Sequence, residues 1–250
     1  MLLFIFFLGL ILGSFYNVVG LRVPANQSIV APRSACPNCK HQLTALELIP
    51  VFSYVVQGGK CRQCRVGISP IYPIVELMTG LLFVSAPLVL GWTSELFVAW
   101  TLISLFMIIF VSDLTYMLIP DKILLAFAGI FLFERLFNPL TPWWDSLLGG
   151  AIGFSLLLLI AVVSKGGMGG GDIKLFALIG FVVGTKTLLL SFFLATLVGA
   201  LFGGFGLAFK LLQKGKPIPF GPFIALGTLI AYYFGDSIIT WYLHLLTIGI

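Results

Sequence analysis

Four cysteines stand out because all of them lie in one hydrophilic segment of an otherwise apolar chain. They form two pairs, CPNC at Cys36 and Cys39 and CRQC at Cys61 and Cys64, with 21 residues between the pairs. A Cys-x-x-Cys pair makes a tight turn that directs two thiolates at one point, and two such turns complete a tetrahedral sulfur site. Because four thiolates leave no open coordination position, the sequence predicts a structural zinc ion.

Two other interpretations of these cysteines remain open: disulfides or a redox pair, and thiols that coordinate nothing. Disulfides need an oxidising compartment, whereas the basic residues around this segment place it on the reducing, cytoplasmic side. His41 follows Cys39 closely enough to replace a ligand, but we favour a solvated histidine or one that neighbours the site. His244, in the last apolar segment, is expected at the membrane interface. A loop of this size has too little core to fold alone, so zinc would stabilise it.

Acidic side chains at the ends of apolar segments are the second group of candidates. Glu95, Glu134, Asp145 and Asp236 fall near predicted outer ends, and Glu76, Asp113, Asp121 and Asp172 fall near predicted inner ends. An ionisable group in a membrane span is costly, so its presence argues for a use. Two carboxylates that share one proton can hydrolyse a peptide bond, one as general base on water and the other polarising the carbonyl.

Asp113 and Asp121 lie in one segment, IIFVSDLTYMLIPD. Pro120 can begin a helix, since its missing N–H costs nothing in the first turn. Asp121 then lies in that turn, where the helix dipole favours an acid. Helix initiation therefore explains Asp121 well and Asp113 less well, which makes Asp113 the stronger candidate for catalysis.

Asp172 follows a run of glycines in SKGGMGGGDIK. Gly166, Gly167, Gly169, Gly170 and Gly171 disfavour a helix and predict irregular backbone up to Asp172, with Lys174 just beyond. Such backbone is tolerated at membrane depth where protein shields it or where it lines a wet cavity, and it lets another chain come close. The string is not a phosphate-binding loop, because the Gly-Lys-Ser/Thr ending is absent.

The composition requires a membrane as the main solvent. Sixty per cent of the 250 residues are hydrophobic and 9 per cent are charged, and the mean hydropathy is +1.13, far from the roughly 25 per cent charge of soluble domains. The first apolar run lacks a basic start and a cleavage site, so we interpret it as a retained span rather than a signal. Apolar stretches lie near 1–21, 72–91, 95–112, 122–137, 145–163, 173–184, 187–209 and 219–246. Eight spans are predicted, with seven and one bent helix as the alternative.

Basic residues orient these spans, because Lys and Arg in short loops are retained on the cytoplasmic side. With 22–71 inside, only Arg135 and Lys186 of the 14 basic residues fall outside. Both chain ends then lie on the outer face. The net charge of +5 is explained by this topology and by contact with membrane lipid. No basic run alternates with exposed aromatics, so nucleic acid is not an expected partner, and no oligomeric state is predicted.

The predicted fold is thus an all-α polytopic membrane protein of about eight helices. Residues 1–21 form the first span, 22–71 a small cytoplasmic zinc-binding loop, and 72–250 a bundle that carries Asp113 and Asp172.

Several segments together resemble the type IV prepilin leader peptidases, membrane aspartyl proteases marked by a Gly-x-Gly-Asp motif. The segments are GSFYNVVGLRVP at 13–24, the two cysteine pairs with ELIP at 47–50 between them, YPIVE at 72–76, DLTYMLIPD at 113–121 and GGGDIK at 169–174. The resemblance covers nearly the whole chain.

This resemblance implies that Asp113 and Asp172 are the catalytic pair, with Asp121, Gly169, Gly171 and Lys174 in support. It also implies a bacterial inner membrane location and a substrate, the basic leader of prepilins or pseudopilins, cut on the cytoplasmic side after a glycine that precedes an apolar helix. Many members methylate the new N-terminus with S-adenosylmethionine, and the family's Gly-Lys before the third cysteine corresponds to Gly59 and Lys60.

A transporter is the alternative from another class. Discontinuous helices in transporters bind ions or protons, and Asp172 after the glycine-rich break could serve in that way. However, transporter sites lie near the midplane of the membrane, whereas these acids lie at the predicted inner face.

Overall fold

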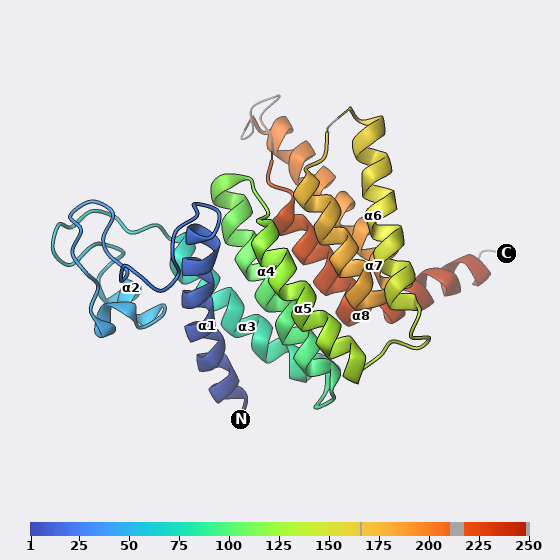
Figure 1. Ribbon diagram of the computed structural model, residues 1–250, viewed down its shortest axis with the longest axis horizontal. Helices are drawn as coiled ribbons and strands as arrows, with labels where there is room; N and C mark the ends of the chain where they lie inside the picture. Colours follow the sequence, from blue (N-terminus) through green and yellow to red (C-terminus); the bar gives the residue numbers. More distant parts are fainter. Residues whose placement is uncertain (166, 211–217, 249–250) are drawn as a thin grey trace. The chain divides into compact units, whose positions relative to one another are not determined.

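The computed structural model describes residues 1–165, 167–210 and 218–248, so that Gly166, Lys214 and Lys216 lie outside the described residues. Over these ranges the chain is helical and has two isolated β-bridges but no strand. The helices are α1 (Leu2–Arg22), the 3₁₀ turn η1 (Ala45–Leu48), α2 (Phe52–Val56), α3 (Ile71–Leu90), α4 (Glu95–Tyr116), α5 (Asp121–Phe137), α6 (Asp145–Val163), α7 (Gly170–Ala208) and α8 (Gly221–Ile248) (Figure 1). The predicted all-α fold is confirmed.

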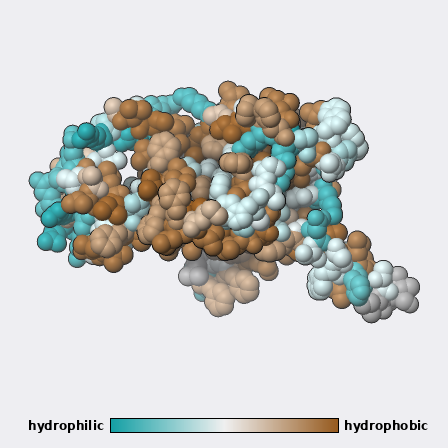
Figure 2. Space-filling view, turned by 90° about the horizontal axis from the view of Figure 1, so that it is seen from below, coloured by the Kyte–Doolittle hydropathy of each residue, from teal (hydrophilic) through white to brown (hydrophobic). Residues whose placement is uncertain are grey.

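Six of the described helices, α1, α3, α4, α6, α7 and α8, are long and apolar enough to cross a membrane. Helix α5 has 17 residues, a length of about 26 Å at 1.5 Å per residue, slightly less than the hydrocarbon core. Figure 2 shows one face of the molecule, on which apolar side chains form most of the surface. A surface of this kind fits a lipid environment rather than water.

The chain forms two compact units, Met1–Tyr116 and Met117–Ile250. In the first unit, α1 packs against α3 and α4 through glycines. A Cβ added at Gly9 would meet the Gly80 Cα at 2.8 Å, and one at Gly20 would meet the Val111 Cβ at 2.7 Å. Small residues let helix backbones approach closely, which replaces the hydrophobic driving force that lipid removes.

Helix α7 in the second unit is a hairpin of two helical segments. Its 39 residues are broken at Gly184, whose φ of 78° and ψ of 173° are not helical. The rings of Phe176 and Phe192 lie 5.9 Å apart, whereas 16 residues of straight helix would separate them by about 24 Å. The chain therefore reverses at Gly184, which favours two short spans here over one bent helix.

Two side chains satisfy the backbone groups that this reversal frees. Arg135 Nε donates to the Val182 carbonyl at 2.8 Å, and Asp145 Oδ2 accepts the Thr185 N–H at 3.2 Å. A broken helix inside apolar surroundings is stable only if its freed polar groups find such partners. Arg135, which the charge pattern placed at the outer end of a span, is thus a buried structural residue, 5% exposed.

Candidate active site and metal centre

The four cysteines come together in the N-terminal unit. All four Sγ atoms lie within 4.8 Å of one another, with Cys36 and Cys64 at 3.7 Å and Cys39 and Cys61 at 3.9 Å. A tetrahedral zinc site with Zn–S bonds of about 2.3 Å requires sulfur separations of about 3.8 Å. The thiols are free, and these separations are far longer than the roughly 2 Å of a disulfide. The geometry fits a metal, and the four cysteines form no disulfide in this structure.

The two cysteine pairs have the same local structure. In each pair the N–H of the first cysteine donates a hydrogen bond to the backbone carbonyl of the residue five positions later. Cys36 donates to His41 at 2.9 Å, and Cys61 donates to Val66 at 2.8 Å. The residue after each second cysteine, Lys40 or Arg65, has a left-handed φ near 60°. Each pair is thus a tight knuckle closed by a β-bridge, Ala35 to Gln42 and Lys60 to Gly67.

Backbone amides around the knuckles favour thiolates. Hydrogen bonds from the backbone of Cys39 and Asn38 lower the pKa of Cys36. The hydrogen bond from the Val66 backbone lowers the pKa of Cys64 to about 6. Despite the hydrogen bond from the His41 backbone, burial and hydrogen bonds with the other cysteines raise the pKa of Cys39 to about 11. Because the thiolate is the form that binds metal, the backbone hydrogen bonds favour metal binding at Cys36 and Cys64.

His41 neighbours the cluster without belonging to it. Its Nε2 lies 3.2 Å from Glu47 Oε2, and Glu47 also accepts the N–H and hydroxyl of Thr44 at 2.9 and 2.8 Å. The backbone and side-chain hydrogen bonds from Thr44, together with His41, hold the pKa of the Glu47 carboxyl below its usual range. This capping box starts η1 and ties the first knuckle to the segment that follows it.

Asp113 lies one turn before the end of α4 and is buried, with 6% exposure. Tyr116, the last residue of α4, fastens this end by donating its hydroxyl to the Leu21 carbonyl of α1 at 3.0 Å. Asp113 and Ser112 are the buried polar side chains at the end of this otherwise apolar helix. Helix initiation does not explain Asp113, because α5 begins only at Asp121.

Asp172 lies in the first turn of α7, where the helix dipole favours a carboxylate. The prediction of irregular backbone up to Asp172 was wrong for its last part, because α7 already begins at Gly170 after Gly169 as N-cap. Glycine is tolerated there because the first N–H groups of a helix need no intrahelical partner. Steric contacts explain why the motif has glycine at two positions. A Cβ at Gly169 would lie 2.9 Å from the Asp172 Oδ2, and one at Gly171 would lie 2.8 Å from the Ile119 Cβ.

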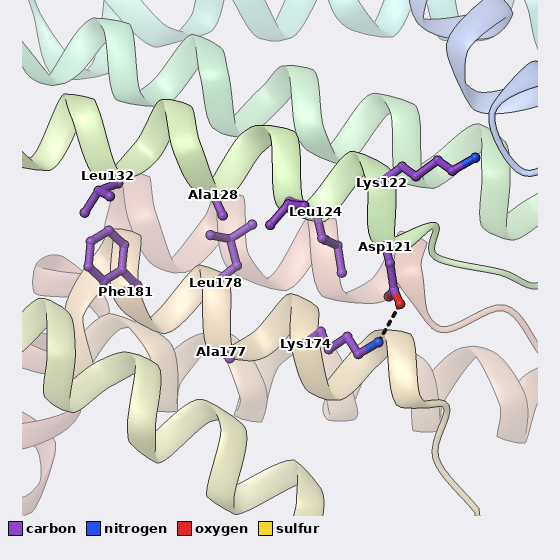
Figure 3. A pocket seen from close by; sticks show the side chains of 10 residues that line it. Asp121, Lys122, Leu124, Ala128, Leu132, Lys174, Ala177, Leu178 and Phe181 are labelled. Atoms are coloured by element: carbon purple, nitrogen blue, oxygen red, sulfur yellow. Dashed lines mark hydrogen bonds and ion pairs between the residues drawn. The ribbon is translucent and has the colours of Figure 1, made fainter. Parts of the chain in front are cut away.

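Asp121 and Lys174 form an ion pair of 2.7 Å between α5 and α7 (Figure 3). Both side chains are more than half exposed, so the pair contributes little stability by itself. It closes one end of a groove of about 640 Å³ whose walls are apolar, including Leu124, Ala128 and Phe181. Asp121 and Lys174, two of the predicted supporting residues, are thus in contact. Lys174 lies two residues after Asp172 in α7.

Gly59 and Lys60 lie at the start of the second knuckle. Gly59 has a φ of +67°, and a Cβ there would lie 2.9 Å from the Tyr54 hydroxyl, whereas Lys60 is exposed. The same unit contains a cavity lined by Asn17, Tyr72 and Glu76, residues that the sequence analysis did not assign to a site. The sequence signal that could have pointed to this cavity was one polar residue within each of two apolar spans, Asn17 in α1 and Glu76 in α3.

The helical fold, the thiolate cluster and an acid at the start of a glycine-led helix define a polytopic membrane protein with a four-cysteine site. Residues 7–90 match the family model of the bacterial peptidase A24 N-terminal domain, and residues 100–204 match that of the type IV leader peptidase family. The chain belongs to the type IV leader peptidase family.

Three curated relatives match this chain along nearly their full length. A prepilin leader peptidase/N-methyltransferase of Bacillus subtilis is 49% identical over 98% of this chain and 99% of its own. Proteins of the same name from Aeromonas salmonicida and Pseudomonas aeruginosa are 36% and 35% identical, over 96% and 95% of this chain and 92% and 91% of theirs. No solved structure matches the chain.

Proposed function

We propose that this protein removes the basic leader of type IV prepilins or pseudopilins and then methylates the new N-terminus with S-adenosylmethionine. Its family and the names of its relatives carry both activities. The observation that carries the peptidase is Asp172, an acid at the start of α7 whose neighbouring glycines leave no room for side chains. A side chain at Gly169 or Gly171 would displace the Asp172 carboxylate or Ile119, so glycine at these positions keeps the carboxylate in place.

In the proposed reaction, Asp113 and Asp172 act as a pair that shares one proton. One carboxylate takes a proton from water, whose oxygen attacks the carbonyl carbon of the glycine that ends the leader. The protonated partner donates a hydrogen bond to the carbonyl oxygen. Collapse of the tetrahedral intermediate breaks the C–N bond, and the departing amine receives a proton. Coupled acids of this kind titrate together, so the pH dependence of cleavage belongs to the pair.

The cysteine cluster would hold a zinc ion in a structural role. Cys36, Cys39, Cys61 and Cys64 occupy all four positions of a tetrahedral site, so no position remains for water or substrate. The residues around them contain only short helices and two isolated bridges, and metal binding would supply much of their folding free energy.

The proposed location is a bacterial inner membrane with the cysteine loop and both acids on the cytoplasmic side. The basic residues of the loop and of the starts of α5 and α7 support this orientation. In the C-terminal unit, the Asp121–Lys174 pair lies at the end of α7 that carries Asp172, away from the reversal at Gly184. No observation favours the transport alternative.

Incubation of the purified protein with a prepilin peptide tests the peptidase. We expect Asp113→Asn and Asp172→Asn each to lower the cleavage rate by at least about a thousandfold, because each removes one half of the acid pair. Unchanged zinc content and thermal unfolding in detergent serve as the folding control. Glu95→Gln, which neutralises an acid at the start of α4, should cleave normally. A folded Asp172→Asn variant that still cuts would refute the assignment.

A further inference from the structure

Five large apolar side chains are exposed in the segment of the cysteine loop that joins its two knuckles. Leu46 lies in η1, Ile49 follows η1, and Phe52, Val55 and Val56 lie in α2. Ile49 is 39% exposed, and the other four are between 63% and 70% exposed. Single apolar residues are common on protein surfaces, whereas a cluster of this kind marks an interaction site. We call these five residues the apolar patch.

Helix α2 turns its more polar face inward and its apolar face outward. Phe52, Val55 and Val56 are three and four positions apart, so they share one face of the helix. Ser53 and Tyr54, on the other face, line the cavity of this unit. A helix surrounded by water has the opposite arrangement, because burial stabilises apolar side chains. The outer face of α2 therefore needs an apolar neighbour.

Backbone hydrogen bonds join the parts of the patch into one surface. The Ser53 N–H donates to the Ile49 carbonyl at 3.1 Å, and the Val55 N–H donates to the Val51 carbonyl at 3.1 Å. Helix α2 also packs against η1. The five apolar side chains are thus held together on one short segment rather than scattered along a flexible loop.

A further hydrogen bond places this segment at the level where α3 enters the membrane. The Val51 N–H, directly before α2, donates to Glu76 Oε2 at 2.7 Å. Glu76 lies in α3, five residues after its start at Ile71, which is about 7.5 Å along the helix at 1.5 Å per residue. In Figure 1, α2 lies on the lower side of the cysteine loop, level with α1 rather than beyond the C-terminal end of α1. The loop thus folds back towards the bilayer.

The charge of the loop complements an anionic membrane surface. Between residues 22 and 71 the loop has one acidic residue, Glu47, and its side chain is buried. Its exposed basic residues are Arg33, Lys40, Lys60, Arg62 and Arg65. Anionic lipids of the cytoplasmic leaflet attract basic segments that lie next to membrane spans.

We propose that the apolar patch inserts into the cytoplasmic leaflet of the membrane, where the basic residues of the loop contact anionic lipid headgroups. Apolar side chains at the acyl boundary and basic residues at the headgroups are the two components by which interfacial segments bind membranes. Lipid is favoured over a partner protein because both ends of the loop continue into spans, α1 and α3. The membrane surface is therefore always within reach of the patch. The inference needs neither enzymatic activity of the proposed function.

Fluorescence quenching tests the insertion with the full-length protein, one molecule per lipid nanodisc. Val55→Cys is labelled with a nitrobenzoxadiazole group after zinc loading, when the native cysteines are protected, and the wild type gives the labelling background. In nanodiscs that contain phosphatidylglycerol, we expect phospholipids with a spin label near the headgroup end of the acyl chain to lower the emission at least about twofold. Soluble iodide should have little effect.

A matched control variant separates insertion from mere proximity to the membrane. Phe52→Ser with Val56→Ser changes two exposed positions, so the labelled variant should keep its fold and its zinc. It should lose quenching by the spin-labelled lipid and gain quenching by iodide. Replacing phosphatidylglycerol by phosphatidylcholine, or combining Arg33→Gln with Arg62→Gln, should weaken quenching by the lipid because the attraction to anionic headgroups is reduced.

The inference is overturned if the spin-labelled lipid does not quench the label at Val55→Cys. It is also overturned if quenching is unchanged in the zinc-containing Phe52→Ser/Val56→Ser protein. Protection from iodide without quenching by the lipid would show that protein covers the patch, which contradicts the inference as well. Equal quenching in both lipids would refute the contacts assigned to the basic residues. Leader cleavage is scored separately, so these outcomes leave the proposed function untouched.

Discussion

At the scale of single residues, the glycines of the Gly-x-Gly-Asp motif differ in what a side chain at each position would contact. Gly169 leaves space beside the Asp172 carboxylate, and Gly171 lets α7 approach Ile119. Gly170, between them, has nothing within 4 Å of an added Cβ. The sequence predicted that this glycine run lets another chain come close, whereas the neighbour at Gly171 is Ile119 of the same chain. It did not predict that the three glycines differ.

Alanine substitutions test this difference directly. Gly169→Ala and Gly171→Ala should lower the rate of leader cleavage at least about tenfold, because the added methyl displaces the carboxylate or Ile119. Gly170→Ala should cleave at close to the wild-type rate. Steady-state kinetics with a prepilin peptide measure all three. Equal losses at the three positions would show that backbone flexibility, rather than space, is what the motif provides.

The cysteines make a second prediction at this scale. Cys64→Ser should lower the zinc content from one ion per chain towards zero, because serine is a poor zinc ligand and three thiolates leave the site incomplete. Elemental analysis of the purified protein measures the metal, and proteolysis of the loop measures its unfolding. Arg62→Ala, a change between the two cysteines of the same knuckle, should keep its zinc. Metal content unchanged in Cys64→Ser would contradict the site.

At the scale of elements, glycine contacts decide which helices pack together. In the C-terminal unit, Cβ atoms added at Gly149 and Gly180 would each overlap the carbonyl oxygen of the other residue. Gly153 has the same relation to the Phe176 carbonyl. Helix α8 packs on α7 through Gly227, where a Cβ would lie 2.6 Å from the Ala195 N. Hydropathy predicted these helices closely but not which faces meet, because glycines on every face look alike in a sequence.

Gly149→Ala should destabilise the protein by about 1–3 kcal/mol, because the methyl group forces α6 away from α7. Gly129→Ala is the matched control: it lies in α5 with nothing within 4 Å of an added Cβ, and it should leave stability unchanged or raise it by about 0.5–1 kcal/mol. Thermal unfolding in detergent compares the two. A Gly149→Ala protein as stable as the control would mean that α6 and α7 do not pack through this contact.

At the scale of the whole molecule, topology follows from the distribution of charge. The reversal at Gly184 gives α7 two antiparallel segments, so that Asp172 and the Lys186–Asp236 ion pair of 2.7 Å lie at opposite ends of its first segment. The prediction that Lys174 is cytoplasmic and Lys186 is not requires such opposite ends, and which end faces the cytoplasm stays a prediction.

Cysteine labelling tests the orientation. Thr93→Cys, between α3 and α4, should react with a membrane-impermeant maleimide in intact cells, because that loop is predicted to face outward. Val30→Cys, in the cysteine loop, should react only after the membrane is permeabilised. Both side chains are exposed, and the wild-type protein controls for its own cysteines. Labelling of Val30→Cys in intact cells would invert the topology.

The sequence alone determined that the chain lies in a membrane, where its helices fall and which side chains are candidate metal ligands. It could do so because hydropathy, charge and the Cys-x-x-Cys spacing are local properties. It also singled out Asp113 and Asp172 as acids where acids are costly. Only the tertiary structure decided what depends on contacts between distant residues: the four sulfurs at metal-binding distance, the reversal of α7, Ile119 against Gly171, and the unpartnered Asn17 Oδ1 in a cavity. An unsatisfied acceptor is a property of its surroundings, so no reading of residue types could have found it.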